Sequence, residues 1–273
     1  MRSRDLEVID GASAGAWIKP RLGGQFGAVT LQVPDGFEAY ARVFHPARDA
    51  EWNSVRWAEV AEFFGAKVHR EMQWHAIVGL HEPGRREGSV WPGQEPSIGE
   101  MDFDDLDALC ELLAAHTADP EHIFYGVCVI ENWEESFTRE QLKNPLLRLP
   151  LGRDHIVLSG PLSAIDQIDN DGGANPGPAR MCFTLAARSS NGAPAPDSRA
   201  TESPSGRNAP NLIWPADHSW LVASEVDFDS TLVGGSAELI EAVVECPRLE
   251  AWRVEPTDSL AADADRVNGT AER

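Results

Sequence analysis

The feature that most constrains the fold is a nearly continuous apolar run from Ile123 to Glu131. Such a run is typical of a central strand that is buried on both of its faces. Further strands are predicted from alternating or apolar stretches bounded by turn residues, over 26–33, 37–44, 155–158, 219–227 and 249–254, with a short one at about 74–79. The first two of these are expected to form a hairpin across the turn at 34–36.

Three helices are predicted from apolar residues at helical spacing. The first covers 55–64 with Ser54 as its cap, and the second covers 102–116 with its start at Asp102 or Asp104. The third covers about 237–245, where Ser236 is the predicted cap.

Together these elements predict an α+β fold: a single domain over residues 26–258, with a mainly antiparallel sheet and two or three packed helices. Residues 1–25 are expected to be a loose N-terminal segment and 259–273 a frayed tail. Residues 188–210 are rich in Ser, Pro, Ala, Asn and Gly, which predicts a disordered insertion. The expected core residues are Phe44, Trp57, Leu109, Leu113, Val127, Val129, Val222 and Leu239.

The charge of the chain limits its partners. Asp and Glu number 44 against 23 Lys and Arg, so the net charge is −21. Nucleic acids and anionic membranes are therefore not expected partners, whereas a basic protein is. No apolar run has the roughly 18 residues of a membrane helix. The N-terminus lacks the apolar stretch of a secretory signal, so a cytoplasmic location is expected.

Three carboxylates alternate in the segment after the predicted closing strand: Glu225, Asp227 and Asp229. If the strand continues through them, all three lie on one face of the sheet. Such a face could hold a divalent cation, or its mutual repulsion could raise the pKa of one carboxyl and create a general acid. The alternative, which stays open, is a solvated outer face.

Other catalytic and metal-binding patterns are missing from the sequence. It contains no GxSxG, GxxxxGK[ST] or strand-linked GxGxxG motif, and its four cysteines form no CxxC pair. His69, His75 and His81 recur every six residues, which does not match the usual spacing of zinc ligands. No metal or other cofactor is therefore expected.

The tryptophans suggest a recognition surface. Trp91, Trp133 and Trp214 lie beside Pro, Gly or acidic residues in predicted loops, and His218 follows closely. Exposed aromatic side chains mark binding surfaces, so these four residues are candidate binding residues. The alternative is that they anchor loops or belong to the core.

Two stretches carry a resemblance, Val33–Pro46 and Asn211–Ser236; the second contains WPADHSW followed by SEVDFDSTLVGGS. With the helix over 102–116, they resemble a family of actinobacterial proteins to which no activity is assigned. The resemblance implies no catalytic residues. In general layout the chain is also similar to immunity proteins of the SUKH type.

Three functional hypotheses follow. The leading one is a non-catalytic protein-interaction or regulatory module with a basic protein partner. The second is an enzyme or metal-dependent protein that uses Glu225, Asp227 and Asp229. The third is an immunity or antitoxin protein.

Overall fold

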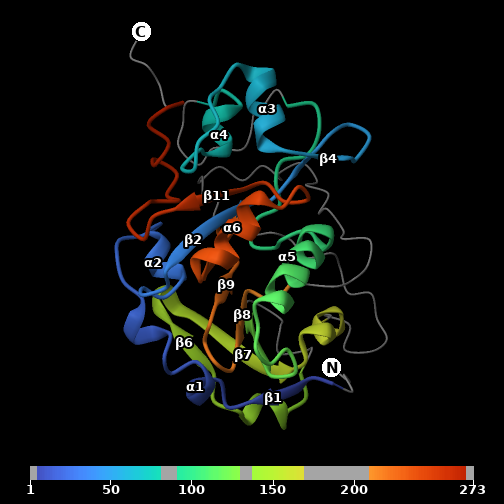
Figure 1. Ribbon diagram of the computed structural model, residues 1–273, viewed down its shortest axis with the longest axis vertical. Helices are drawn as coiled ribbons and strands as arrows, with labels where there is room; N and C mark the ends of the chain where they lie inside the picture. The colour runs from blue at the N-terminus through green and yellow to red at the C-terminus, as the bar shows by residue number, and fades with distance from the viewer. Residues whose placement is uncertain (1–4, 81–90, 130–136, 169–208, 269–273) are drawn as a thin grey trace, which may run out of the picture.

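The computed structural model describes residues 5–80, 91–129, 137–168 and 209–268, and a sheet of nine strands forms its centre (Figure 1). The order across the sheet is β1, β7, β5, β8, β9, β10, β2 and β11, and β6 pairs with β7. Every pair is antiparallel, so the predicted α+β class with a mainly antiparallel sheet is confirmed. The strands are β1 Glu7–Ile9, β2 Ala39–Phe44, β5 Ile123–Cys128, β6 Leu147–Leu149, β7 Arg153–Gly160, β8 Leu212–Pro215, β9 Leu221–Ala223, β10 Ser230–Gly235 and β11 Ala251–Val254.

A separate two-stranded ribbon and several helices surround this sheet. The ribbon pairs β3 (Ala47–Arg48) with β4 (Ser54–Val55). None of the helices in the described ranges is long and apolar enough to cross a membrane. The α-helices are α1 Gly11–Ala14, α2 Val29–Gln32, α3 Trp57–Phe64, α4 Trp74–Ile77, α5 Phe103–Ala115 and α6 Ala237–Glu245. Short 3-10 turns are η1 Lys19–Arg21, η3 Gln141–Lys143, η4 Pro150–Gly152 and η5 Leu162–Gln167.

The two longest helices, α5 and α6, cover one face of the sheet and form its larger core. Both lie close to their predicted bounds. The Ser236 hydroxyl caps α6 by accepting a hydrogen bond from the Leu239 N–H at 3.2 Å. Seven of the eight predicted core residues are buried in the protein, and Val129 is partly buried against this core.

The opposite face of the sheet is covered by the N-terminal segment, α2 and the C-terminal segment. Side chains alternate between the faces of a strand, so every second residue of β7, β8 and β9 points to this side. Val157, Leu212 and Ala223 form this second core with Ile18 and Val29. The candidate site described below continues the same face beyond the end of this core.

Helix α3 shows how a distant residue can fix a helix start. Ser54, the predicted cap, lies in β4 instead. The Glu250 carboxylate accepts hydrogen bonds from the N–H groups of Trp57 at 2.5 Å and Ala58 at 2.8 Å. These are two of the four N–H groups that a helix start leaves without partners. At the other end, Gly65 has a φ of 69° and ends the helix after Phe64, the predicted last residue.

Two predicted strands are wrong. The stretch 26–33 contains the single turn of helix α2, and Gly27 within it has a φ of 87° that an extended strand does not accommodate. The predicted hairpin over 26–44 is therefore absent, although 37–44 contains β2. The stretch 74–79 contains α4, in which Trp74 and Ile77 are buried three residues apart.

The segments expected to be loose at both ends are packed where the structure describes them. β1 pairs with β7, and Leu6 and Ile18 are buried, so residues 5–25 are not a loose lead-in. Near the other end, Leu260 is buried and Asp265 accepts a hydrogen bond from the Gln73 N–H at 3.1 Å. The predicted disordered insertion at 188–210 lies outside the described residues, apart from its last two positions.

Candidate functional site

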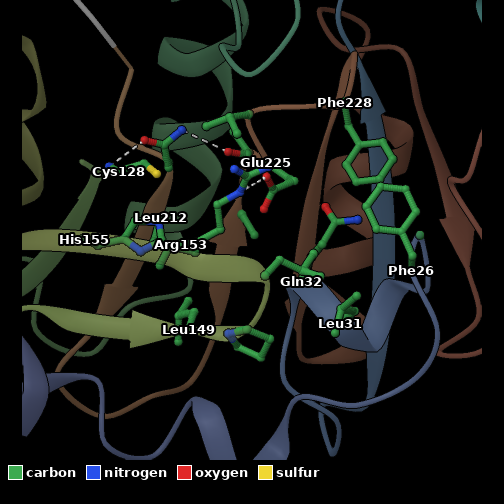
Figure 2. Close-up of a pocket in the computed structure, with 17 residues that line it drawn as sticks. Phe26, Leu31, Gln32, Cys128, Leu149, Arg153, His155, Leu212, Glu225 and Phe228 are labelled. Carbon is green, nitrogen blue, oxygen red and sulfur yellow. Dashed lines mark hydrogen bonds and ion pairs between the residues drawn. The ribbon is translucent and has the colours of Figure 1, made fainter. Parts of the chain in front are cut away.

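A cleft opens on the second face of the sheet, where β5 and β9 end and β8 begins (Figure 2). Its walls are α2, the first residues of β7, η4 and the turn over 224–228. Its enclosed volume is about 30 Å³, room for one or two water molecules, and the cleft widens from there into open solvent. Side chains two residues apart on one strand share a face. Arg153 and His155 therefore lie on the same face as Val157, which is in the second core, and they line the cleft beside it.

The floor of the cleft is held by Asn211. Its side-chain oxygen accepts a hydrogen bond from the Cys128 N–H at 2.9 Å, and its amide donates to the Ser224 carbonyl at 3.1 Å. One side chain therefore ties the end of β5 to the segment that follows β9. Burial raises the pKa of the Cys128 thiol to about 11, so at neutral pH this cysteine is a thiol and a poor nucleophile.

A chain of hydroxyls runs from the cleft wall into the interior. The His45 Nδ1 faces the carbonyl oxygen of Ser97 at 2.9 Å and must donate to it, which leaves Nε2 to accept from the Thr231 hydroxyl at 2.8 Å. Thr231 in turn accepts from the Ser224 hydroxyl at 2.6 Å. The proton of Ser224 is thus directed away from the cleft, and the chain makes this wall rigid.

His155 is a buried polar group at one end of the cleft, beside Arg153 and Leu212 (Figure 2). Only 4% of the residue is exposed, and its Nδ1 has no hydrogen-bond partner among the described residues. Burial lowers the pKa of His155 to about 4, so its imidazole is neutral at physiological pH. A neutral imidazole with an unpaired nitrogen can donate or accept one further hydrogen bond.

Gln32 is a second buried polar group, at the end of α2. It is 8% exposed, and neither atom of its carboxamide has a hydrogen-bond partner within the part of the chain that the structure describes. Figure 2 shows this carboxamide between the aromatic pair Phe26 and Phe228 and the carboxylate of Glu225. Leaving a buried donor and acceptor unpaired costs about 1–3 kcal/mol per group, so such groups call for a partner.

An ion-pair cluster lies between these two groups. Arg153 Nε contacts Glu225 Oε1 at 2.8 Å, and Arg153 Nη2 pairs with the Asp227 carboxylate. Burial raises the pKa of Glu225 and outweighs the opposing effect of Arg153. The cluster therefore carries one positive and two negative charges when all three groups are ionised.

Apolar side chains form the mouth of the cleft. Phe26 is 56% exposed, and its ring centroid lies 5.9 Å from that of Phe228. Leu151, which also lines the cleft, is 52% exposed and has a φ of 64°. The left-handed region is unfavourable for a leucine, so the corner at η4 holds a strained residue at the mouth.

The three carboxylates predicted to share a strand face do not do so. β9 ends at Ala223, and the residues from 224 to 229 form a turn before β10. Glu225 and Asp227 pair with Arg153, whereas Asp229 pairs with the buried Arg42 at 3.6 Å. Within the described residues, no three His, Cys, Asp or Glu side chains are grouped to hold a metal ion.

The predicted binding residues do not gather in the cleft. Trp214 lies on β8 and is fully buried, so its placement in an exposed loop was wrong. Trp91 is partly buried and its Nε1 donates to the Arg48 carbonyl at 2.9 Å. His218, at a φ of 58°, stacks on Trp17 with ring centroids 4.3 Å apart. Trp133 lies outside the described residues.

The regularly spaced histidines also have separate positions. His69 pairs with Asp265 at 2.9 Å, His75 is buried, and His81 lies outside the described residues. Gln32, Arg153 and His155 are not among the site residues predicted from the sequence. Arg153 and His155 belong to a run of three polar residues at the start of β7, and the period of two along a strand places both on the same face as Val157.

Fold and site together define an α+β protein with an open, largely apolar-rimmed cleft on one face of an antiparallel sheet. Comparison of the chain with protein-family models, with curated proteins and with solved structures finds no match.

Proposed function

We propose that this protein binds a small amphipathic molecule in the cleft between α2 and the ends of β5, β8 and β9. The observation that carries the proposal is that two buried side chains line the cleft with polar atoms that have no hydrogen-bond partner among the described residues, the Gln32 carboxamide and the His155 Nδ1. Leaving these polar groups unpaired in the folded protein costs free energy. A ligand that supplies their hydrogen-bond partners recovers this free energy.

The lining of the cleft fits such a ligand. Small-molecule sites are concave and mostly apolar, with a few polar groups that fix orientation. Here Phe26, Leu151 and Phe228 provide apolar surface near the mouth, and Gln32 and His155 provide polar groups inside. The rigid wall from Ser224 to His45 and the Asn211 bridge hold the site in shape without a ligand.

This proposal keeps the idea of a binding module but changes its basis. The acidic strand face predicted from Glu225, Asp227 and Asp229 is a turn in which Glu225 and Asp227 already pair with Arg153. A basic protein partner stays a prediction that rests on the net charge of −21. The enzyme and immunity hypotheses likewise stay predictions, and the cleft supports neither of them specifically.

The test is a fragment screen of the full chain by protein-observed NMR, with a library that spans acids, amines, amides and apolar rings. We expect some fragments to shift resonances of residues around the cleft, including the side-chain amide of Gln32. The variant Leu151→Arg, which puts a long charged side chain at the mouth, should weaken this binding. A matched change far from the cleft, Val267→Arg at another exposed site, should not. A library that shifts no cleft resonance would overturn the proposal.

A further inference from the structure

We propose that the tip of the β3–β4 ribbon is a docking surface for a basic protein, and that Trp52 is the side chain that inserts into this partner. The surface is separate from the cleft of the proposed function. Three features indicate it: the conformation and exposure of Trp52, the hydrogen bonds that fix its loop, and the charge around it.

Trp52 has a conformation and a position that stability alone does not favour. Its φ is 68°, in the left-handed region, and 58% of the residue is exposed. The Asp49 N–H donates to the Asn53 carbonyl at 3.0 Å, so 50–52 is a three-residue hairpin loop, in which the left-handed position is usually a glycine. A tryptophan there adds backbone strain and leaves a large apolar side chain in water. Retained strain is concentrated at functional sites, and tryptophan is among the residues that contribute most to protein–protein binding.

The loop around Trp52 is fixed by hydrogen bonds to Asp49. The Asp49 carboxylate accepts from the N–H groups of Glu51 at 3.0 Å and Asn53 at 2.8 Å. The Asp49 carbonyl accepts from the Trp52 N–H at 3.1 Å. The loop therefore presents Trp52 in one conformation before a partner arrives, which reduces the entropy lost on binding.

A second exposed aromatic side chain lies near the ribbon. Phe63 on α3 is 68% exposed, and its ring centroid lies 6.0 Å from that of Trp91. The Trp91 Nε1 donates to the carbonyl of Arg48, the last residue of β3, at 2.9 Å. Trp91 thus connects α3 to the base of the ribbon, and Figure 1 shows the ribbon next to α3 with its loop projecting away from the sheet. A protein that binds Trp52 can therefore also contact Phe63.

The charge around these two aromatic side chains selects a cationic partner. Residues 49–63 contain one cation, Arg56, and four carboxylates: Asp49, Glu51, Glu59 and Glu62. The last three carboxylates are exposed, and the neighbouring Arg48 is paired with Asp102. An apolar side chain with a carboxylate rim fits a pocket bordered by lysines and arginines, which also interact favourably with the face of a tryptophan. The same carboxylates repel an anionic membrane and a second copy of this chain.

The experiment selects random peptides of about 16 residues, displayed on phage, against the immobilised full chain. Enriched peptides are synthesised, and their binding is measured by fluorescence anisotropy. We expect them to combine Lys or Arg with aromatic or aliphatic residues. Their affinity should fall at least about threefold between about 50 and about 500 mM NaCl, because salt screens the carboxylates.

Three variants locate the effect. Trp52→Gly should weaken peptide binding at least about tenfold, and Phe63→Ser at least about threefold. Leu151→Gly is the matched control, because it also removes an exposed apolar side chain from a left-handed position but lies at the cleft, so peptide affinity should not change. Since relief of strain exceeds the added chain entropy of glycine, the Tm of both glycine variants should rise by about 1–3 °C.

Three results would overturn the inference. The first is a selection that enriches no peptide, enriches acidic peptides, or enriches peptides that bind Trp52→Gly as tightly as the wild type. The second is a fall in the Tm of Trp52→Gly, which would show that the tryptophan is retained because it stabilises the fold. The third is binding to phosphatidylcholine–phosphatidylglycerol vesicles, or a dimer in analytical ultracentrifugation, that is lost in Trp52→Gly; the occupant would then be a membrane or a second copy.

Discussion

The unpaired carboxamide of Gln32 leads to a prediction about stability in the absence of ligand: the variant Gln32→Met should be more stable than the wild type. Methionine has the same unbranched length and a similar helix propensity, so α2 and the packing around residue 32 are retained. The change removes a buried donor and acceptor that have no partners among the described residues. Each unpaired group costs about 1–3 kcal/mol when it is fully buried. Because the burial of Gln32 is incomplete, we expect the two groups together to cost less than twice this, and the variant to gain about 1–3 kcal/mol in the free energy of unfolding.

The assay is urea unfolding of both proteins without ligand, with thermal unfolding as a second measure. For a protein of this size, each kcal/mol corresponds to a rise of about 2–4 °C in Tm. Gln94→Met, at an exposed position, is the control and should change stability by less than about 0.5 kcal/mol. A loss of stability in Gln32→Met would refute the reasoning, because it would show that the carboxamide makes favourable hydrogen bonds in the free protein.

Three further predictions concern charged and titratable groups. Folding lowers the pKa of His155 from 6.5 to about 4, so the unfolded chain binds the extra proton and stability falls as pH drops through this interval. Between about pH 7 and 5, the wild type should therefore lose about 2 kcal/mol more of its unfolding free energy than His155→Gln does, as measured by urea unfolding. Equal losses in the two proteins would contradict this. Arg153→Met leaves Glu225, whose side chain is 15% exposed, without its cation; it should destabilise by about 1–3 kcal/mol, and Glu225→Gln in the same chain should restore part of this in a double-mutant cycle. Glu250→Ala removes the acceptor for two N–H groups of α3 and should cost about 1–2 kcal/mol, with faster amide exchange at the start of α3, while Glu250→Gln should cost less.

The elements predicted well are those whose signals lie within the element itself. Helix α6 has its cap, its apolar stripe and its end within ten residues, and its predicted bounds match. The central strand β5 is recognised by its continuous apolar run. Helix α2 was predicted as part of a strand because Val29, Leu31 and Val33 alternate with polar residues. The contacts that hold it come from elsewhere in the chain: the Val29 N–H donates to the Asp258 carbonyl at 3.1 Å.

The candidate site was harder to predict, because its residues come from separate segments. Arg153 and Glu225 are 72 positions apart in the sequence, so their pairing does not follow from either local pattern. The alternation of Glu225, Asp227 and Asp229 suggested a strand face, but the turn that carries them sends Asp229 to Arg42 instead. The unpaired state of Gln32 depends on what surrounds it in three dimensions, and no sequence pattern reports that.

The position of β2 in the sheet has a consequence for synthesis of the chain. All six residues of β2 are buried, and its two neighbours, β10 and β11, begin 191 and 212 residues after it (230 − 39 and 251 − 39). At ribosomal rates of about 5–20 residues per second, β2 waits about 10–40 s for either neighbour to be made. Throughout this interval the nascent chain carries an apolar segment with both edges unpaired, which is the kind of segment that holdase chaperones cover.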